Sequence, residues 1–493
     1  MNKQVALKQL QSPAILDLAF DYALFDRQNK DHFCDFSELE AAQENKEQWL
    51  AELAAALEHP ENYEPTPAFA YLMPKNRLCE RRLIYLPLRD LVLRYAFSLV
   101  LAETLEHQLI ETCFANRRAT GEDAKTQLTE YFATGGWPRF CEWQKNEAER
   151  HSVLIKTDIS SFYDSVCQDY FLEALAHHLK WPLDAPLLRL FARLLQVPIV
   201  YTAAAQGQCL IPRVMQHGLL IGSSVEGYFT NLYLNEVDQA MRRLGASYGR
   251  YVDDICIFAD SEEQARLYLH ELQASLLPLG LNLNASKTRL VDKENEPQAF
   301  AESLDRPLQQ QSRFFNEGED FNWVQEGKDF CKFMSARNAE GKLLLPLKKR
   351  TEWHVEQLLH LLFSERTAVK HAVWLLVQTA IYRQVPLKTR HYTRDFIIDL
   401  LADERTNDYV KCRCLHHLVK PRKKKDGSHW RYIDAFNTTQ NKKLMDLLPQ
   451  LLAAQGMELK LMAVYLAADY WNVKQLNGSD SFMMQSHRSC KAP

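Results

Sequence analysis

Two adjacent aspartates, Asp253 and Asp254, stand between short apolar segments, and this feature constrains the fold more than any other. Residues 250–252 (RYV) precede the pair, and the apolar run ICIFA follows it at 255–259. β-Branched and aromatic residues on both sides predict two strands that are joined by a tight turn. Neighbouring carboxylates raise each other's pKa, and a divalent cation relieves that repulsion. Taken alone, the tetrapeptide YVDD at 251–254 is also compatible with an acidic turn that faces solvent.

A second strand, far upstream, also ends in a carboxylate. Residues 153–158 (VLIKTD) form an apolar run that ends at Asp158, and the aromatics Phe162 and Tyr163 begin a helix just beyond it. Two strands that each deliver an aspartate can hold two Mg²⁺ ions about 4 Å apart for an in-line phosphoryl displacement. Oxygen ligands favour Mg²⁺, or Mn²⁺, over zinc. The sequence therefore predicts a two-metal site.

The chain divides into three predicted domains. Residues 1–70 are expected to be a helical N-terminal extension, residues 71–300 a region of strands and helices, and residues 301–493 all α-helical. A long amphipathic helix is predicted at about 89–109. Successive helical segments of similar length after 300 suggest stacked helical hairpins, as in an irregular α-solenoid.

Composition places the chain among ordinary globular proteins. It has 493 residues, of which 46% are hydrophobic and 25% charged, and no apolar run approaches the roughly 20 residues needed to span a bilayer. The first residues lack the apolar segment of a secretory signal, and the eleven cysteines form no CxxC pair. We therefore expect a cytoplasmic protein without a membrane partner. The net charge is −4, with positive charge concentrated in residues 301–493, which is where a polyanion is expected to bind.

Six blocks along the chain resemble the motifs of reverse transcriptases. The Asp158 segment is similar to motif A of that family, and YVDD at 251–254 to its YxDD motif C. Between them, residues 218–234 are similar to motif B, and residues 279–288 downstream are similar to motif D. Upstream, residues 74–90 resemble the fingers motif of group II intron and retron enzymes, and residues 113–121 resemble the block that follows that motif.

The resemblance implies an α+β fold. It would have the right-hand fingers and palm of a polymerase, with an antiparallel sheet in the palm, followed by an all-α thumb and helical-repeat domain. It also implies an RNA-directed DNA polymerase that uses dNTPs, an RNA template and two Mg²⁺ ions, and that makes a DNA product.

The same resemblance assigns roles to residues around the metal site. Asp158, Asp253 and Asp254 would be metal ligands, together with the main-chain carbonyl of Ile159. Tyr163 matches the family's steric gate, where a bulky ring clashes with a ribose 2′-hydroxyl; a core aromatic is the alternative. Lys287 would act in catalysis by donating a proton to pyrophosphate, unless it is a simple surface lysine.

Other residues are assigned to nucleotide and nucleic acid. Lys75 and Arg82 would bind the triphosphate as cationic partners, with a solvated basic face as the alternative. Gly222 would let the main chain approach the incoming nucleotide. Nucleic-acid contacts are assigned to Arg117, Arg118 and Asn231, and to the basic loop that contains Lys423, Lys424 and Lys425.

Two features favour one branch of the family. Ile221 occupies a position where motif B commonly has glutamine, and a long helical region follows the last motif. Both are similar to the bacterial abortive-infection and defence-associated (unknown-group) reverse transcriptases. That resemblance implies phage defence, a companion noncoding RNA as template or priming on a protein tyrosine, and a homo-oligomer, either a trimer or a hexamer.

Three alternatives stay open. The first is a template-independent polymerase, similar to a terminal transferase, that causes abortive infection. The second is the reverse transcriptase of a retron or of a diversity-generating element. The third is a catalytically inactive RNA-binding scaffold, which the presence of all three aspartates disfavours.

Overall fold

The computed structural model describes residues 3–470 except 30–33, 77, 131–134, 202–212, 306–322, 338–341, 366–368, 424–428 and 455–456. One hydrophobic core runs from Ala6 in the first helix to Leu466 in the last, and a smaller cluster lies beside it. The three predicted domains therefore share a core, and the boundaries between them stay predictions.

A four-stranded antiparallel sheet, here called the Asp sheet, carries the aspartates. Its strand order is β6-β7-β3-β8, with bounds Ser247–Tyr251 (β6), Asp254–Ala259 (β7), Val153–Asp158 (β3) and Arg289–Asp292 (β8). Successive side chains of a strand point to opposite faces. Leu154 and Phe258 accordingly pack in the smaller cluster, while Ile155 and Ile257 join the main core.

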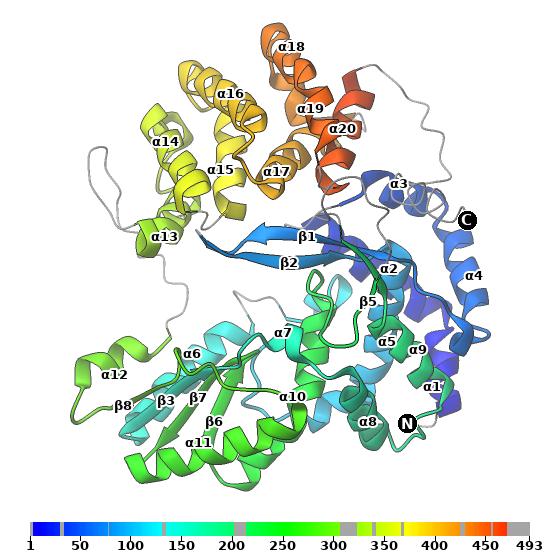
Figure 1. Cartoon of the computed structure of the whole chain (residues 1–493), viewed down its shortest axis with the longest axis vertical. Coiled ribbons are helices and arrows are strands. Elements are labelled where there is room, and N and C mark those ends of the chain that lie inside the picture. The colour runs from blue at the N-terminus through cyan, green and yellow to red at the C-terminus, as the bar shows by residue number, and fades with distance from the viewer. Residues whose placement is uncertain are drawn as a thin grey trace.

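Helices cover both faces of the Asp sheet (Figure 1). On one face α6 (Gly136–Arg150) contributes Phe140 to the smaller cluster, and α12 (Pro297–Ser303) contributes Phe300. On the other face α10 (Val225–Arg243) and α11 (Glu262–Leu276) pack their apolar side chains into the main core. Both faces of the sheet are thus covered by helices.

A second sheet, here called the N-terminal sheet, has the order β2-β1-β4-β5. Its strands are β1 (Ala68–Pro74), β2 (Glu80–Tyr85), β4 (Pro198–Tyr201) and β5 (Arg213–Val214). β1 and β2 form an antiparallel hairpin, and β1 pairs with β4 in parallel. The predicted long helix is confirmed as α5 (Leu88–Leu105).

The remaining helices of the N-terminal two-thirds flank these sheets. They are α1 (Lys3–Leu10), α2 (Pro13–Asn29), α3 (Phe36–Glu44), α4 (Lys46–Ala56), α7 (Phe162–Ser165), α8 (Gln168–Leu179) and α9 (Pro186–Leu195). The N-terminal helices also support the rest of the chain. Arg27 of α2 donates to the carbonyl of Leu86, and Glu38 of α3 accepts from the main-chain nitrogen of Leu88 at the start of α5.

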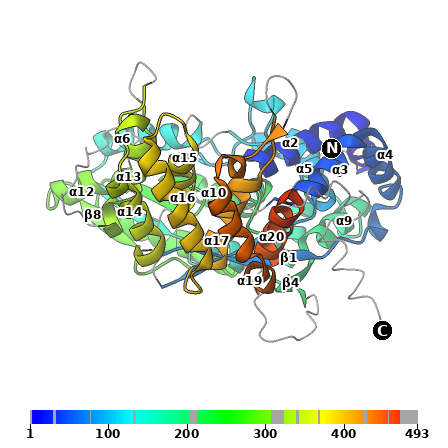
Figure 2. The ribbon, with the colours of Figure 1, turned by 90° about the horizontal axis from the view of Figure 1, so that it is seen from above.

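The described part of the C-terminal region is helical, as predicted, except for one small hairpin. Helices α14, α16, α17 and α20 lie side by side in Figure 2. The helices are α13 (Trp323–Ser335), α14 (Glu352–His360), α15 (Val369–Ile381), α16 (Leu387–Ala402), α17 (Asp408–Val419), α18 (Thr438–Asp446), α19 (Leu448–Ala453) and α20 (Met457–Tyr470). The hairpin pairs β9 (Arg422–Lys423) with β10 (His429–Trp430).

The C-terminal helices return to the beginning of the chain. Tyr409 of α17 stacks on Tyr71 of β1, with ring centroids 6.3 Å apart. The hydroxyl of Tyr465 on α20 donates to Asp35 Oδ1 at 2.6 Å, just before α3. These contacts join the last helices to the N-terminal sheet and to α3.

No helix among the described residues is both long enough and apolar enough to cross a lipid bilayer.

Candidate active site

The fold brings the three predicted aspartates to one end of the Asp sheet. In the antiparallel pairing of β3 with β7, Asp158 lies directly opposite Asp254. The main-chain nitrogen of Ile159 donates to the carbonyl of Asp253 at 3.2 Å and so ties the β6–β7 turn to the end of β3. Residues almost one hundred positions apart in sequence thereby become neighbours.

Electrostatics at this end are those of crowded carboxylates. Burial, together with the charges of Asp158 and Asp254, raises the pKa of Asp253 to about 6. Burial and the charge of Asp158 raise the pKa of Asp254 as well. A cation bound here would lower both values, so the chemistry of the donor set fits a hard divalent ion.

One cation of the protein already contacts the site. Lys287 lies in the turn before β8, and its Nζ is 2.9 Å from Asp158 Oδ2. Asn284 fixes the same turn, because its main-chain nitrogen donates to the carbonyl of Asp158 at 2.7 Å and its side chain to Oδ2 at 3.2 Å. Among the described residues, no three carboxylate, imidazole or thiolate groups converge closely enough to hold an ion as they stand. The three aspartates share one end of the sheet, and their side chains would have to turn toward a common ion.

The predicted gate and the predicted phosphate ligand also meet beside this site. Tyr163, in α7, is half-buried; burial and the nearby charge of Asp253 raise the pKa of its hydroxyl. Its neighbour Phe162 is the core aromatic, with only 2% of its surface exposed. Arg82 of β2 forms an ion pair with Asp164, with Nη2 to Oδ1 at 2.5 Å. An ion pair therefore joins the N-terminal sheet to α7 next to Tyr163, the predicted steric gate.

Lys75 and Gly222 both lie at the β1–β2 hairpin. Lys75 is exposed in the turn after β1, and its main-chain nitrogen bonds to the carbonyl of Cys79. At Gly222 a Cβ atom would lie 2.2 Å from the carbonyl oxygen of Ile84 in β2. The main-chain nitrogen of Ile84 donates to the carbonyl of Ile221 at 2.7 Å. The close approach that requires glycine here is to the protein's own β2 strand.

The arginines assigned to nucleic acid have protein partners. Arg117 pairs with Glu106, with Nε to Oε1 at 2.7 Å, and donates to the carbonyls of Ile110 and Cys113. Arg118 is half-buried, with its main-chain nitrogen bonded to Glu106. The Arg117 guanidinium therefore holds the loop after α5, and a role for either arginine toward nucleic acid stays a prediction.

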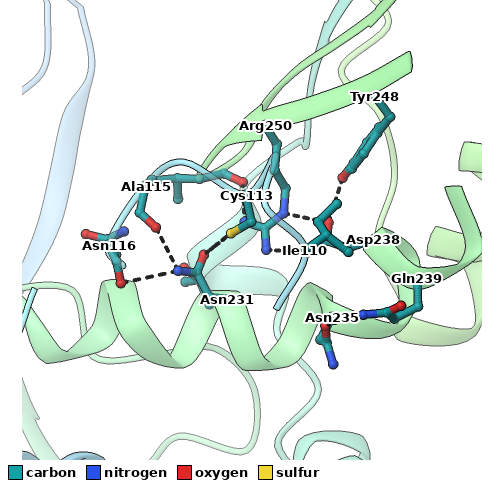
Figure 3. A network of polar contacts seen from close by, with 12 residues as sticks. Ile110, Cys113, Ala115, Asn116, Asn231, Asn235, Asp238, Gln239, Tyr248 and Arg250 are labelled. Atoms are coloured by element: carbon teal, nitrogen blue, oxygen red, sulfur yellow. Dashed lines mark hydrogen bonds and ion pairs between the residues drawn. The ribbon is translucent and has the colours of Figure 1, made fainter. Parts of the chain in front are cut away.

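Asn231 requires a correction. It is completely buried in α10, where its amide donates to the carbonyls of Ala115 and Asn116 and accepts from Cys113 and Arg250 (Figure 3). A side chain enclosed in this way cannot contact nucleic acid directly, so that assignment is wrong for this structure. Asn231 therefore has a structural role, and only its burial in the folded chain distinguishes it from an asparagine that binds nucleic acid.

The predicted basic loop is only partly described. Lys423 belongs to β9, and Lys424 and Lys425 lie outside the described residues. The guanidinium of Arg422, the other residue of β9, lies over the ring of Tyr432, at 3.7 Å from its centroid. The contacts of the three lysines with nucleic acid stay predictions.

Sequence reasoning missed the buried partners of the site, above all Asp238. This residue is fully buried on α10 and binds Arg250, the residue before YVDD. A sequence signal existed: Asp238 falls on the apolar stripe of α10, four residues after Leu234 and three before Met241. A charge at such a position needs a buried partner.

Part of the chain is similar to a known protein family. Residues 106–314 match a family model described as "Reverse transcriptase (RNA-dependent DNA polymerase)". This segment therefore carries the sequence features of a reverse transcriptase domain, and the family that the model describes consists of RNA-dependent DNA polymerases, which are nucleotidyltransferases. Such domains generally use divalent metal ions.

Two solved structures are similar at low identity. An apo telomerase from Candida tropicalis, truncated from its C-terminal domain, is 14% identical; the match covers 50% of this chain and 54% of that one, with a TM-score of 0.33. A telomerase from Candida albicans, in complex with a TWJ fragment of telomeric RNA, is 13% identical, with 88% and 68% covered and a TM-score of 0.35. The chain thus spans about half the length of the first structure. No curated protein matches the sequence.

Proposed function

We propose that the chain makes DNA from dNTPs by two-metal nucleotidyl transfer at Asp158, Asp253 and Asp254. The pairing of Asp158 with Asp254 across β3 and β7 carries this proposal, because it delivers both strand ends to one point. The raised pKa of Asp253 supports it, since repulsion between carboxylates is what a bound cation relieves.

The three aspartates, with the carbonyl of Ile159, would hold two Mg²⁺ or Mn²⁺ ions, which supply activation of the attacking 3′-hydroxyl and charge stabilisation at the phosphates. Lys287 is the residue of this chain placed to give a proton to pyrophosphate, since its ammonium already lies 2.9 Å from Asp158.

On the nucleotide side, Arg82 and Lys75 would bind the triphosphate as cations. Tyr163 would close the space where a ribose 2′-hydroxyl would otherwise fit. The contact between Gly222 and β2 would hold these groups at a fixed distance from the aspartates, because it locks the segment before α10 onto the strand that carries Arg82.

Primer extension with purified protein tests the proposal. An RNA template with a DNA primer, all four dNTPs and Mg²⁺ should give full-length DNA, and Asp253→Asn should remove it. Asp260→Asn is a matched control, since Asp260 is an exposed carboxylate just past the opposite end of β7. If Asp253→Asn still extends the primer at the wild-type rate, the proposed site is wrong.

The same protein separates templated from untemplated synthesis. We propose templated synthesis on RNA, with a template-independent, terminal-transferase-like activity as the alternative. Incubation with each dNTP alone and no RNA should yield no product if synthesis is templated. Homopolymer growth under those conditions would favour the alternative.

We also propose that this activity serves anti-phage defence, with a companion noncoding RNA as template or a protein tyrosine as primer. Ile221 before Gly222 and the helical C-terminal region support the proposal, since both resemble the defence-associated branch. Phage plating on cells that express the wild type or Asp253→Asn tests it, and equal plating would exclude it. Sequencing of copurified nucleic acid separates it from a retron or a diversity-generating element.

We further propose a homo-oligomer, a trimer or a hexamer. Light scattering on the purified chain measures this directly, as a multiple of the 57.3 kDa monomer mass. A monomeric mass at micromolar concentration would contradict it.

A further inference from the structure

Arg250, the residue just before YVDD, is fully buried, and each guanidinium nitrogen has a protein acceptor (Figure 3). Nε and Nη2 donate to the two carboxylate oxygens of Asp238, both at 2.7 Å. Nη1 donates to Asn231 Oδ1 at 3.0 Å and to the carbonyl of Val252 at 3.2 Å. Asp238 is also fully buried and accepts from the hydroxyl of Tyr248 at 2.9 Å.

The carbonyl that Arg250 reaches belongs to a strained residue. Val252 has φ of 60°, in the left-handed region. A β-branched residue rarely adopts this conformation unless surrounding contacts impose it. Val252 is also the residue immediately before Asp253, so its main-chain conformation sets the direction in which the following carboxylates leave the turn.

The turn is held from both sides. Arg250 binds the carbonyl of Val252, and the main-chain nitrogen of Ile159 binds the next carbonyl, that of Asp253, at 3.2 Å. The backbone of Arg250 is fixed as well, because its nitrogen donates to the carbonyl of Thr112 and its carbonyl accepts from Phe114. Two successive carbonyls of the turn are thus attached to rigid neighbours.

We infer that Arg250, held in place by Asp238 and Asn231, is a positioning residue that maintains the left-handed turn at Val252 and so aims Asp253 and Asp254 toward Asp158. The inference rests on the proposed function, because it takes those aspartates as the groups that bind divalent ions. Arg250 touches neither substrate nor metal in this role. It acts through the main chain of the turn.

A lysine cannot replace this arginine. The planar guanidinium binds both oxygens of Asp238 and still reaches Val252, whereas an ammonium is a single point charge on a flexible stem. Arg250→Lys therefore keeps the buried charge and loses the link to the turn. The variant separates positioning from simple charge balance.

The test measures Mn²⁺ binding to the free protein by electron paramagnetic resonance, and then steady-state kinetics. We expect Arg250→Lys to raise the Mn²⁺ dissociation constant by roughly 10- to 100-fold, as with other groups that orient metal ligands. The kcat should fall in parallel, while the KM for dNTP stays within about twofold, because the nucleotide contacts are unchanged. Adding Val252→Gly should recover part of the Mn²⁺ affinity, since glycine adopts the left-handed turn without support.

Arg94→Lys is the matched control. Arg94 is equally buried and pairs with Glu226 at 2.6 Å, at the other end of α10 and away from the turn. It should lose thermal stability with unchanged Mn²⁺ affinity. A milder variant, Tyr248→Phe, removes only one hydroxyl from Asp238 and should raise the Mn²⁺ dissociation constant by roughly two- to fivefold; this variant decides the matter if Arg250→Lys does not fold.

Asp253→Asn separates failure of this inference from failure of the proposed site. If Asp253→Asn weakens Mn²⁺ binding while Arg250→Lys and Tyr248→Phe leave it unchanged, the positioning role is wrong and the site stands. If Asp253→Asn also leaves Mn²⁺ binding unchanged, the proposed site itself is wrong. Equal losses of Mn²⁺ affinity in Arg94→Lys and Arg250→Lys would reduce both arginines to a general structural role.

Discussion

The two ends of α10 carry the same buried chemistry and support different parts of the molecule. Near its start, Glu226 pairs with Arg94 of α5; near its end, Asp238 pairs with Arg250 of β6. All four side chains are essentially inaccessible to solvent. The first pair lies beside the segment that packs on β2, and the second lies beneath the aspartate turn.

The pairs differ in how completely they are satisfied. All three guanidinium nitrogens of Arg250 have acceptors, whereas Nε of Arg94 has none among the described residues. Despite Arg94, burial raises the pKa of Glu226. A buried pair is costly to desolvate unless every polar atom is bonded. The fully bonded pair is the one attached to the turn, where a small displacement would move two carboxylates.

Neutralising the carboxylate of Asp238 or of Glu226 should give the largest loss of stability. Asp238→Asn and Glu226→Gln each leave a buried arginine without its counter-charge, at a cost of about 3–5 kcal/mol in stability. Only Asp238→Asn should also weaken Mn²⁺ binding. Urea unfolding and Mn²⁺ titration measure the two effects, and a loss of Mn²⁺ affinity in Glu226→Gln would erase the distinction between the two ends.

The start of α10 is next most sensitive, at Gly222. Gly222→Ala places a methyl group 2.2 Å from the Ile84 carbonyl oxygen and should cost about 1–3 kcal/mol, with a raised KM for dNTP. Gly245→Ala is the control, because Gly245 has a positive φ of 73° but a Cβ there would have open space around it. That control should cost about 1 kcal/mol and leave the KM unchanged. Comparable KM values in the two variants would disconnect the Gly222 contact from nucleotide binding.

The aspartate turn between β6 and β7, which the pair at the end of α10 contacts, should make stability depend on pH. The pKa of Asp253 is raised to about 6, so the folded protein holds this proton more tightly than the unfolded chain does. Ionisation of Asp253 as the pH rises therefore lowers the stability of the metal-free protein. Asp253→Asn should stabilise that form by roughly 1–3 kcal/mol at pH 8, with the gain vanishing below about pH 4. Thermal unfolding in chelator measures it, and a gain that grows toward acid pH would reverse the assignment.

The smallest effect belongs to the exposed pair beside the gate. Asp164 holds Arg82, and half of the Asp164 side chain is exposed, so the pair is worth about 0.2–1 kcal/mol. Asp164→Asn should free Arg82 for the triphosphate and lower the KM for dNTP by up to about fivefold. Asp169→Asn, an exposed aspartate at the start of α8, is the control. A higher KM would mean that Asp164 orients Arg82 instead of competing for it.

Sequence patterns predicted much of this fold because they depend on short-range periodicity. The apolar runs predicted β3 and β7, and the helical spacing of apolar residues predicted α5 and the helical C-terminal region. Asn231 shows the limit: its motif position suggested nucleic acid, and burial made it structural. Gly222 shows another, since the contact that requires glycine is with Ile84, about 140 positions earlier.

By itself, the sequence determined that three aspartates would stand at strand ends, because alternation and turn composition are local properties of the chain. Only the tertiary structure decided which buried charges meet. Asp238 and Arg250 are paired because both are desolvated at one place between α10 and β6, and a lone charge there would be too costly. The same holds where the last helices reach Asp35 and Tyr71, since contacts between distant segments depend on how whole faces pack.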